Sequence, residues 1–90
     1  MIHFIAALEP DRRGGFGVFF PDLPGLASSG ETREDAVARA TQALSGHIGA
    51  MREDGDEIPA ARSMKALSAD PDSADAIEGC ILVAIPLFDH

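Results

Sequence analysis

The stretch FGVFFPDLPG, residues 16–25, carries most of what the sequence says about the fold. In its first half Phe16, Val18 and Phe20 share one parity, the period-two pattern of a strand with one apolar face. Two prolines follow, and each fixes φ and removes a backbone donor, so the strand cannot continue through them. Gly25 can supply a positive φ at the end of the turn. The stretch therefore predicts a strand that ends in a rigid turn.

The segments on either side of this stretch complete a predicted antiparallel meander. Upstream, residues 2–8 alternate around larger apolar side chains and predict a first strand. Residues 9–15 contain a proline, a basic pair and two adjacent glycines, which are typical of an exposed turn. Downstream, residues 26–29 predict a short strand with small side chains, and Gly30 ends it. Strand, turn, strand, turn and short strand are thus expected in chain order.

A long amphipathic helix is predicted immediately after the third strand. Thr32 is a good N-cap, and Asp35, three residues later, gives a pattern similar to a capping box. The acidic, turn-rich residues 53–57 end the helix. The apolar residues between these limits are spaced 3, 4, 4 and 3 apart and trace one helical stripe: Val37, Ala40, Leu44, Ile48 and Met51.

The C-terminal third is predicted to hold a short helix and a last strand. Residues 61–69 suit a short helix with Met64 and Leu67 facing inward, and residues 70–75 are expected to form a polar loop. Residues 79–86, GCILVAIP, are the most hydrophobic run in the chain. The run is too short for a buried helix and rich in β-branched residues, so it predicts a strand.

This last strand is apolar on both faces, and such a strand needs cover on both. One long helix covers only one face of a small sheet. We expect the other face to include Phe19, Ile81, Val83 and Ile85, covered partly by the short helix and partly by a second polypeptide. These four residues are therefore candidates for self-association, with a homodimer as the default and a homotetramer as the alternative.

Length and charge narrow the class of function. The 90 residues suffice for one domain, 1–90, with one modest core. Seven basic and fifteen acidic residues give a net charge of −8. That charge opposes direct binding to nucleic acid phosphates or to an anionic membrane surface, and it suits a basic protein partner. A contribution to solubility alone is the competing explanation. No apolar run approaches the roughly 20 residues of a membrane span.

Cysteine and histidine content argues against a metal or redox site. The single cysteine, Cys80, lies in an apolar run and is interpreted as a small buried residue, and its isolation fits a reducing cytoplasm. His3, His47 and His90 are too scattered in sequence to form a metal site, and no cofactor is expected. A metal-dependent nuclease would need several converging carboxylates, and no local spacing brings three together.

The stretch 16–25, followed by Ser28, residues 30–32 and the helix start at 34–36, resembles the N-terminal domain of the HicB antitoxin family. The resemblance extends upstream to the first strand and downstream to the last strand, so it covers nearly the whole chain. It implies an α+β fold, a small antiparallel β-β-β-α-β domain described as a partial ribonuclease H-like fold, with the helix packed on one face of the sheet.

The resemblance also implies a partner. Members of this family bind and neutralise HicA, a small basic toxin that cleaves mRNA, and many carry a further C-terminal domain that binds promoter DNA. No such domain follows the last strand here, so DNA binding is not attributed to these 90 residues. The expected role is non-enzymatic and cytoplasmic: steric occlusion of the toxin. The alternatives are a stand-alone oligomeric HicB-like binding or scaffold module without a toxin, and a degenerate metal-dependent nuclease.

Candidate toxin contacts follow from the charge and from the rigid turn. The acidic candidates are Glu9, Asp11, Asp22 and Glu31, for each of which a solvated surface position is the competing interpretation. Leu23, between the two prolines, is a candidate exposed anchor that would bind at low entropic cost. The competing reading of residues 21–25 is a purely structural turn that leads into the third strand.

Overall fold

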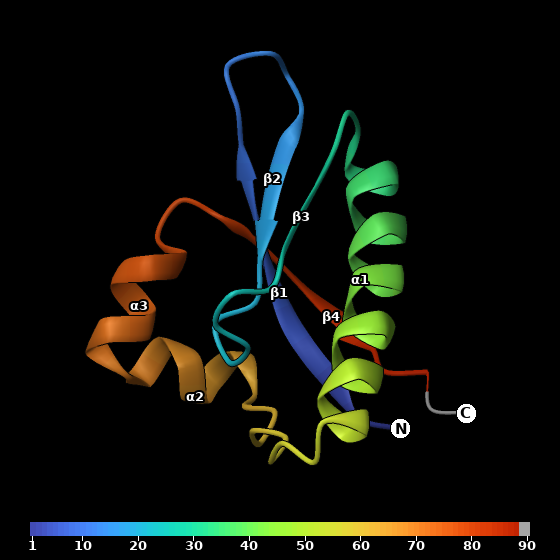
Figure 1. Ribbon diagram of the computed structural model, residues 1–90. Coiled ribbons are helices and arrows are strands. Elements are labelled where there is room, and N and C mark those ends of the chain that lie inside the picture. Colours follow the sequence, from blue (N-terminus) through green and yellow to red (C-terminus); the bar gives the residue numbers. More distant parts are fainter. Residues whose placement is uncertain (89–90) are drawn as a thin grey trace.

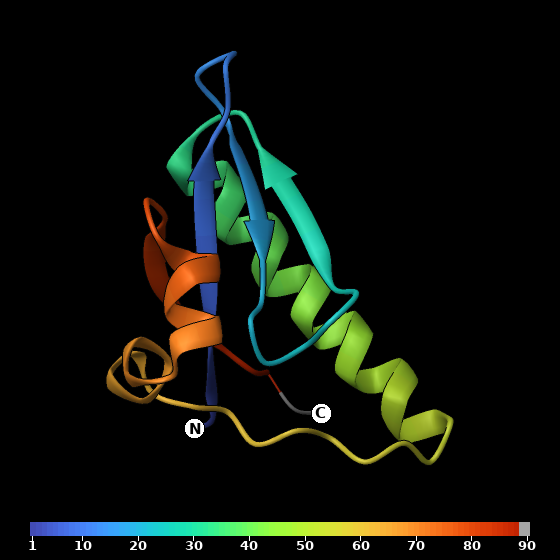
Figure 2. The same cartoon turned by 90° about the vertical axis from the view of Figure 1, so that its left-hand side faces the viewer.

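The computed structural model describes residues 1–88 and shows a four-stranded antiparallel sheet between two helical layers (Figure 1). The long helix α1 covers one face, and the short helices α2 and α3 cover part of the other (Figure 2). In chain order the elements are β1 (His3–Pro10), β2 (Phe16–Phe19), β3 (Ala27–Gly30), α1 (Arg33–Glu53), α2 (Met64–Ala69), α3 (Pro71–Ile77) and β4 (Ile81–Pro86).

The predicted α+β class, the meander and the β-β-β-α-β order are confirmed. The strands lie in the order β3-β2-β1-β4, so the chain crosses from one edge of the sheet to the other between β3 and β4. All neighbouring strands are antiparallel, with Leu8 opposite both Val18 and Ile81. The prediction of a polar loop at residues 70–75 is wrong, because Asp70 and Pro71 start α3. The Asp70 side chain caps this helix by accepting from the Asp72 N–H, and Pro71 has the φ of a first helical residue.

The core between α1 and the sheet follows the predicted stripe. Ala40, Leu44 and Ile48 are buried, and Val37 and Met51 pack at its margin. They meet the even-numbered residues of β1, Val18 of β2 and Phe20 just beyond that strand. The capping prediction is confirmed as well: the Thr32 hydroxyl accepts from the Asp35 N–H at 3.0 Å, and an Asp35 carboxylate oxygen accepts from the Glu31 N–H at 3.1 Å. The first bond satisfies an orphan N–H group of the first helical turn, and the second holds the residue before the N-cap against that turn.

The opposite face of the sheet is covered from within the chain. Ile5 and Ala7 of β1 pack with Leu67 of α2 and Ile77 of α3. The inward position predicted for Leu67 is confirmed, since it is fully buried. Met64 was expected to face inward as well, but its side chain is 40% exposed. It is the first residue of α2 and lies before the turn that contacts the sheet.

The sequence places Ile81, Val83 and Ile85 on the sheet face opposite α1, and this prediction is wrong. Ile81, Val83 and Ile85 pack in the core beside α1, and Ile85 is fully buried. Phe19 does lie on the opposite face, together with Cys80 and Leu82. The reason is the register: Ile85 is opposite Phe4, and residues directly opposite one another in a sheet share a face. A run that is apolar on both parities cannot reveal this register from sequence alone.

Candidate functional site

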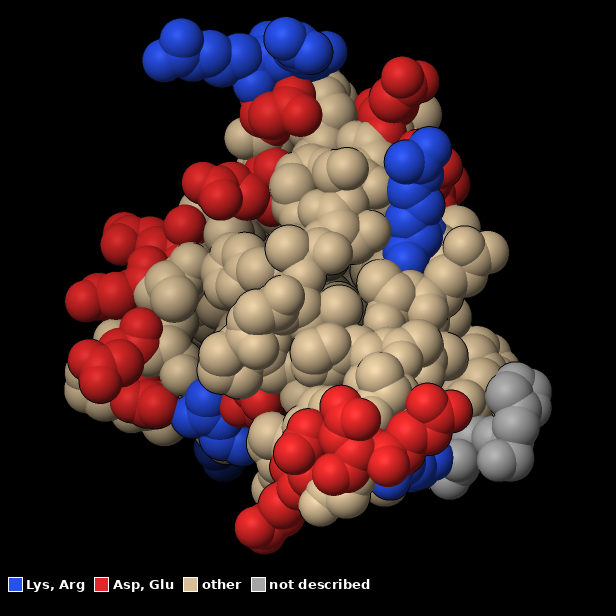
Figure 3. Space-filling view, in the orientation of Figure 1, with Lys and Arg blue, Asp and Glu red and all other residues tan. Residues whose placement is uncertain are grey.

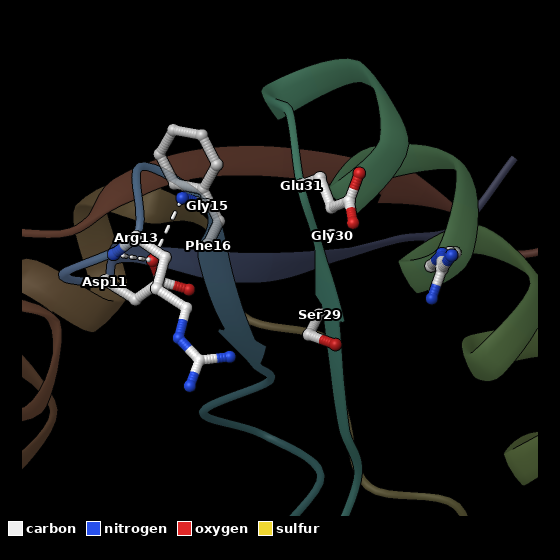
Figure 4. Close-up of a pocket in the computed structure, with 8 residues that line it drawn as sticks. Asp11, Arg13, Gly15, Phe16, Ser29, Gly30 and Glu31 are labelled. Carbon is white, nitrogen blue, oxygen red and sulfur yellow. Dashed lines mark hydrogen bonds between the residues drawn. The ribbon is translucent and has the colours of Figure 1, made fainter.

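A hollow of about 490 Å³ opens where the tip of the β1–β2 hairpin approaches the end of β3 and the first turns of α1 (Figure 4). We call it the hairpin hollow. Its walls come from three separate segments of the chain and carry carboxylates, guanidinium groups and one aromatic ring. The lining residues are Asp11, Arg13, Gly15, Phe16, Ser29, Gly30, Glu31 and Arg39.

The hairpin side of the hollow is built by Asp11. One of its carboxylate oxygens accepts from the backbone N–H groups of Arg13, at 2.8 Å, and of Gly15, at 2.9 Å. The backbone adds a bond from the Asp11 N–H to the Gly15 carbonyl, and Gly14 takes a positive φ of 85°. An aspartate that bonds to the backbone two residues on is a standard turn device. Asp11 therefore holds the shape of the hairpin, besides contributing charge.

The helix side depends on a very close approach of backbones. A Cβ atom on Gly30 would lie 2.3 Å from the Ala36 nitrogen, and one on Gly15 would lie 2.8 Å from the Gly30 carbonyl oxygen. Only glycine fits at such distances. The hairpin tip, the end of β3 and the start of α1 thus lie directly against each other, which brings Asp11 and Glu31 to one hollow although they are far apart in sequence.

The charges in the hollow are of both signs. Arg39 donates from Nε to an Asp35 carboxylate oxygen at 3.3 Å, an exposed pair one helical turn apart. Within residues 1–88 no hydrogen bond or ion pair engages the Glu31 carboxylate. Phe16 presents its ring on the hairpin side, across from Glu31 on the β3 side (Figure 4). An aromatic ring together with an unengaged carboxylate suits a lysine or arginine side chain of another molecule.

Two of the predicted contact residues lie at this hollow, and two do not lie at any accessible surface. Asp11 and Glu31 line it, and Glu9 lies on β1, exposed but outside the lining. Leu23 was expected as an exposed anchor, but it is buried at 1% exposure in the core beside α1. Asp22 was expected as an acidic surface contact, but its side chain is 6% exposed. Both corrections favour the structural interpretation of the turn at residues 21–25.

Asp22 is buried because it is paired. Its carboxylate accepts from the backbone N–H of Arg62 at 2.8 Å and from the Arg62 Nε at 2.6 Å. Arg62 also donates to an Asp70 carboxylate oxygen at 2.9 Å and to the Ser73 hydroxyl at 3.0 Å. This Arg62 cluster ties the turn after β2 to α2 and α3. Sequence reasoning missed it, because the partners are 40 residues apart and nothing near Arg62 indicates that it pairs with Asp22.

The electrostatics of the cluster follow from these bonds. The hydrogen bond from Arg62, followed by that from Ser73, lowers the pKa of Asp70. The same interactions with Asp22 and Asp70 raise the pKa of Arg62. Elsewhere, burial raises the pKa of the Cys80 thiol, and the charge of Glu9 adds to that effect. Cys80 is half-buried beside Ile5 and Ala7, and not fully buried as predicted. A thiol with a raised pKa is a poor nucleophile, which agrees with a packing role.

On the face shown in Figure 3, acidic side chains cover more of the surface than basic ones. They gather over α3 and over the turn that follows α1, where Asp72, Asp75, Glu53 and Glu57 are exposed. Between these regions the surface over β2, β3 and the turn that joins them is largely uncharged (Figure 3). In residues 1–88 no group of three or more His, Cys, Asp or Glu side chains is arranged to hold a metal ion. Over the same range, no helix is both long enough and apolar enough to span a bilayer.

Comparison with solved structures defines the class of protein first. The chain is similar to the Burkholderia pseudomallei antitoxin HicB, with a TM-score of 0.80 and 28% identity over 97% of this chain and 64% of that one. It is similar to the N-terminal domain of that antitoxin, with a TM-score of 0.79 over 97% and 99% of the two chains. It also resembles a chain of the HicA3 and HicB3 toxin–antitoxin complex, with a TM-score of 0.76 and 25% identity over 98% and 100%. The fold is that of HicB antitoxin domains.

Sequence comparison then gives the family. Residues 4–90 match the family described as HicB_like antitoxin of bacterial toxin-antitoxin system, and the chain belongs to this family. It is 38% identical over 58 residues to antitoxin HicB 1 of Photorhabdus laumondii, covering 64% of this chain and 37% of that protein. It is 36% identical over 63 residues to an uncharacterized 14.9 kDa protein of Haemophilus phage HP1, covering 70% and 47%. The chain thus spans less than half the length of these curated relatives.

Proposed function

We propose that this chain neutralises a small basic, mRNA-cleaving toxin of the HicA type by covering the surface with which the toxin binds RNA. The observation that carries the proposal is the hairpin hollow, which is lined by the exposed Glu31 and the half-buried Phe16 beside the edge strand β3. The net charge of −8 adds long-range attraction for a basic protein. The similarity to a chain of a HicA3 and HicB3 complex supports a partner of this kind.

The mechanism that we propose is contact, without catalysis. A toxin that binds RNA phosphates must expose lysine and arginine side chains, and those same side chains fit carboxylates. Glu31, with Asp11 held in its turn, would engage such a side chain at the hollow, and exposed Glu9 would add attraction nearby. Steric exclusion of RNA follows once the partner is bound. We place this action in the cytoplasm, where mRNA and a free thiol such as Cys80 coexist.

The test is co-expression with the product of the neighbouring gene, which the proposal requires to be a small basic protein. We expect the chain to restore growth when that protein is induced and to co-purify with it. Glu31→Lys should weaken binding at least about tenfold at low salt, because it sets a like charge against the basic partner. The matched control is Glu57→Lys, which makes the same change at an exposed position after α1, away from the hollow. Equal affinities of the two variants would refute the assignment of the contact surface to the hollow.

A separate assay tests the absence of catalysis. The purified chain should leave RNA and DNA intact in the presence of Mg²⁺ or Mn²⁺. Cleavage that disappears in a Glu31→Gln variant would replace the contact mechanism with a nuclease activity at the same hollow.

We also propose that the chain self-associates. The sequence predicts self-association from a sheet face left without cover, but α2 and α3 cover much of that face. The free edge of β4 supports self-association instead.

A further inference from the structure

The direction of the backbone groups in β4 is fixed by one hydrogen bond just beyond it. The Leu87 N–H donates to the Ile2 carbonyl at 2.9 Å, so the backbone groups of Leu87 point toward β1. Along a strand, successive residues point their N–H and C=O groups to opposite sides. Ile85, Val83 and Ile81 therefore bond to β1, in register with Phe4, Ala6 and Leu8.

The residues between them point away from the sheet. β4 is an edge strand of the described sheet, so the N–H and C=O groups of Leu82 and Ala84 face outward from it. The exposure of the Ala84 side chain agrees with an open edge at this point. Pro86 also points outward and has no N–H, so it presents only an acceptor and ends the pattern. The edge thus offers a short ladder of two complete donor–acceptor residues.

This ladder is complementary to itself. A second β4 strand, antiparallel and related by a two-fold axis through Val83, sets Leu82 opposite Ala84 of the copy and Ala84 opposite its Leu82. Each such pair exchanges both of its backbone bonds. A shift of two residues in one direction sets Pro86, which lacks an N–H, opposite Leu82. A shift in the other direction sets Cys80 opposite Ala84, although the Cys80 N–H is already donated to the Ile77 carbonyl at 3.0 Å.

We propose that the free edge of β4 is a dimer interface at which a second copy of this chain continues the sheet, with Val83 at the two-fold axis. The proposal rests on the self-association proposed above and specifies its surface. The occupant is a copy because the edge matches itself in one register and because residues 79–88 carry no charge. A basic partner would find no carboxylate within this run.

The charge distribution agrees with this choice of edge. Two chains of net charge −8 repel each other, so they can meet only where neither is charged. The paired residues of the proposed interface, Ile81–Pro86, include no charged side chain, so no carboxylate lies within the contact itself. The β3 edge instead leads directly into Glu31 and Glu34.

A matched pair of proline variants tests the interface. Ala84→Pro removes an outward N–H from β4 and leaves the bonds between β4 and β1 intact. Ala27→Pro is the control: it removes an outward N–H from β3, the other edge of the sheet, at the first residue of that strand, where proline is tolerated. Both side chains are exposed in the single chain. The mass in solution is measured by sedimentation equilibrium without any partner, and folding of each variant by circular dichroism.

We expect the wild-type chain and Ala27→Pro to have twice the mass of a single chain, and Ala84→Pro to have the mass of one. A wild-type chain that stays single at every concentration overturns the proposal. An Ala84→Pro variant that remains dimeric also overturns it, as does a folded Ala27→Pro variant that becomes monomeric.

Hydrogen exchange on the wild-type chain gives an independent reading that does not need a variant to fold. The amide protons of Leu82 and Ala84 should be protected at high concentration and should exchange freely on dilution, whereas the Val83 amide should stay protected in both. Equal exchange of Leu82 and Ala84 at the two concentrations refutes the interface. The proposed antitoxin role can be refuted independently of the interface. A chain that dimerises through β4 but does not restore growth contradicts only the antitoxin role.

Discussion

Replacement of Gly30 by alanine adds only one methyl group but should destabilise the domain strongly. The added Cβ would lie 2.3 Å from the Ala36 nitrogen and 2.5 Å from its Cα, where ordinary contact begins at 3.4 Å. The backbones of β3 and α1 must therefore separate by about 1.1 Å, and neither is the end of a flexible side chain. Ala36 is fully buried, so the shift also loosens the core beneath the first turn of α1.

The expected cost follows from that geometry. Overpacking usually costs about 1–3 kcal/mol, and a contact between two backbones falls at the upper end. The free energy of unfolding of a small domain is about 5–15 kcal/mol, so Gly30→Ala should remove a large part of it. In a chain of this length the melting temperature should fall by roughly 10–20 °C. The φ of Gly30 is not positive, so the effect is steric and does not arise from a backbone conformation reserved for glycine.

Urea unfolding followed by far-ultraviolet circular dichroism measures this effect, since the chain has no tryptophan or tyrosine for fluorescence. Gly46→Ala is the matched control: a Cβ there meets nothing within 4 Å, and alanine favours a helix interior by about 1 kcal/mol. One substitution should therefore lower the free energy of unfolding and the other should raise it. If Gly30→Ala unfolds at the same urea concentration as the wild-type chain, the close approach of β3 and α1 is wrong.

Three further predictions concern the Arg62 cluster and the thiol. Arg62→Met should lower the urea midpoint far more than Arg39→Met, because the first leaves the Asp22 carboxylate buried without its guanidinium partner and the second breaks an exposed pair; equal midpoints would refute the structural role of the cluster. The pKa of Asp70 is lowered in the folded chain, so its ionised carboxylate stabilises the fold above the ordinary aspartate pKa range, and this stabilisation is lost as the pH falls through the lowered pKa. The urea midpoint should therefore fall more steeply with acid in the wild-type chain than in Arg62→Met. Parallel pH curves for the two chains would contradict this role of Asp70. Since burial raises its pKa, Cys80 should react with iodoacetamide at neutral pH more slowly than a free cysteine in a peptide, and equal rates would refute its burial.

The elements that sequence reasoning predicts well are those with a local physical signal. The alternation in residues 16–20, the prolines that end it and the Thr32 cap each act within a few residues, and the structure confirms them. Leu44 and Ile48 are buried on the predicted stripe for the same reason, because a helix repeats regularly along its own sequence. Such signals need no knowledge of what lies across the fold.

The elements that sequence reasoning misses depend on partners distant in the chain. Nothing near Asp22 reveals that Arg62 will neutralise it, so an aspartate in a turn is predicted at the surface. The face of Ile85 depends on its pairing with Phe4, and an all-apolar strand does not specify its own register. α3 is not predicted because aspartate and proline mark both turns and helix starts, and the helical backbone bond from the Ala74 N–H to the Asp70 carbonyl at 2.8 Å is visible only in the structure.

The corrected positions of Asp22 and Leu23 change where a partner is expected to bind. The turn at residues 21–25 anchors the sheet to two helical layers at once: Leu23 enters the core beside α1, and Asp22 holds Arg62 at the start of the α2–α3 layer. Neither of these two side chains is therefore available to contact another protein. The two free edges of the sheet differ in charge, because one leads into Glu31 and the strand at the other, β4, carries no charge. The two proposed contacts require this separation, because the negative charge that favours binding of a basic protein opposes pairing with a second copy of the chain.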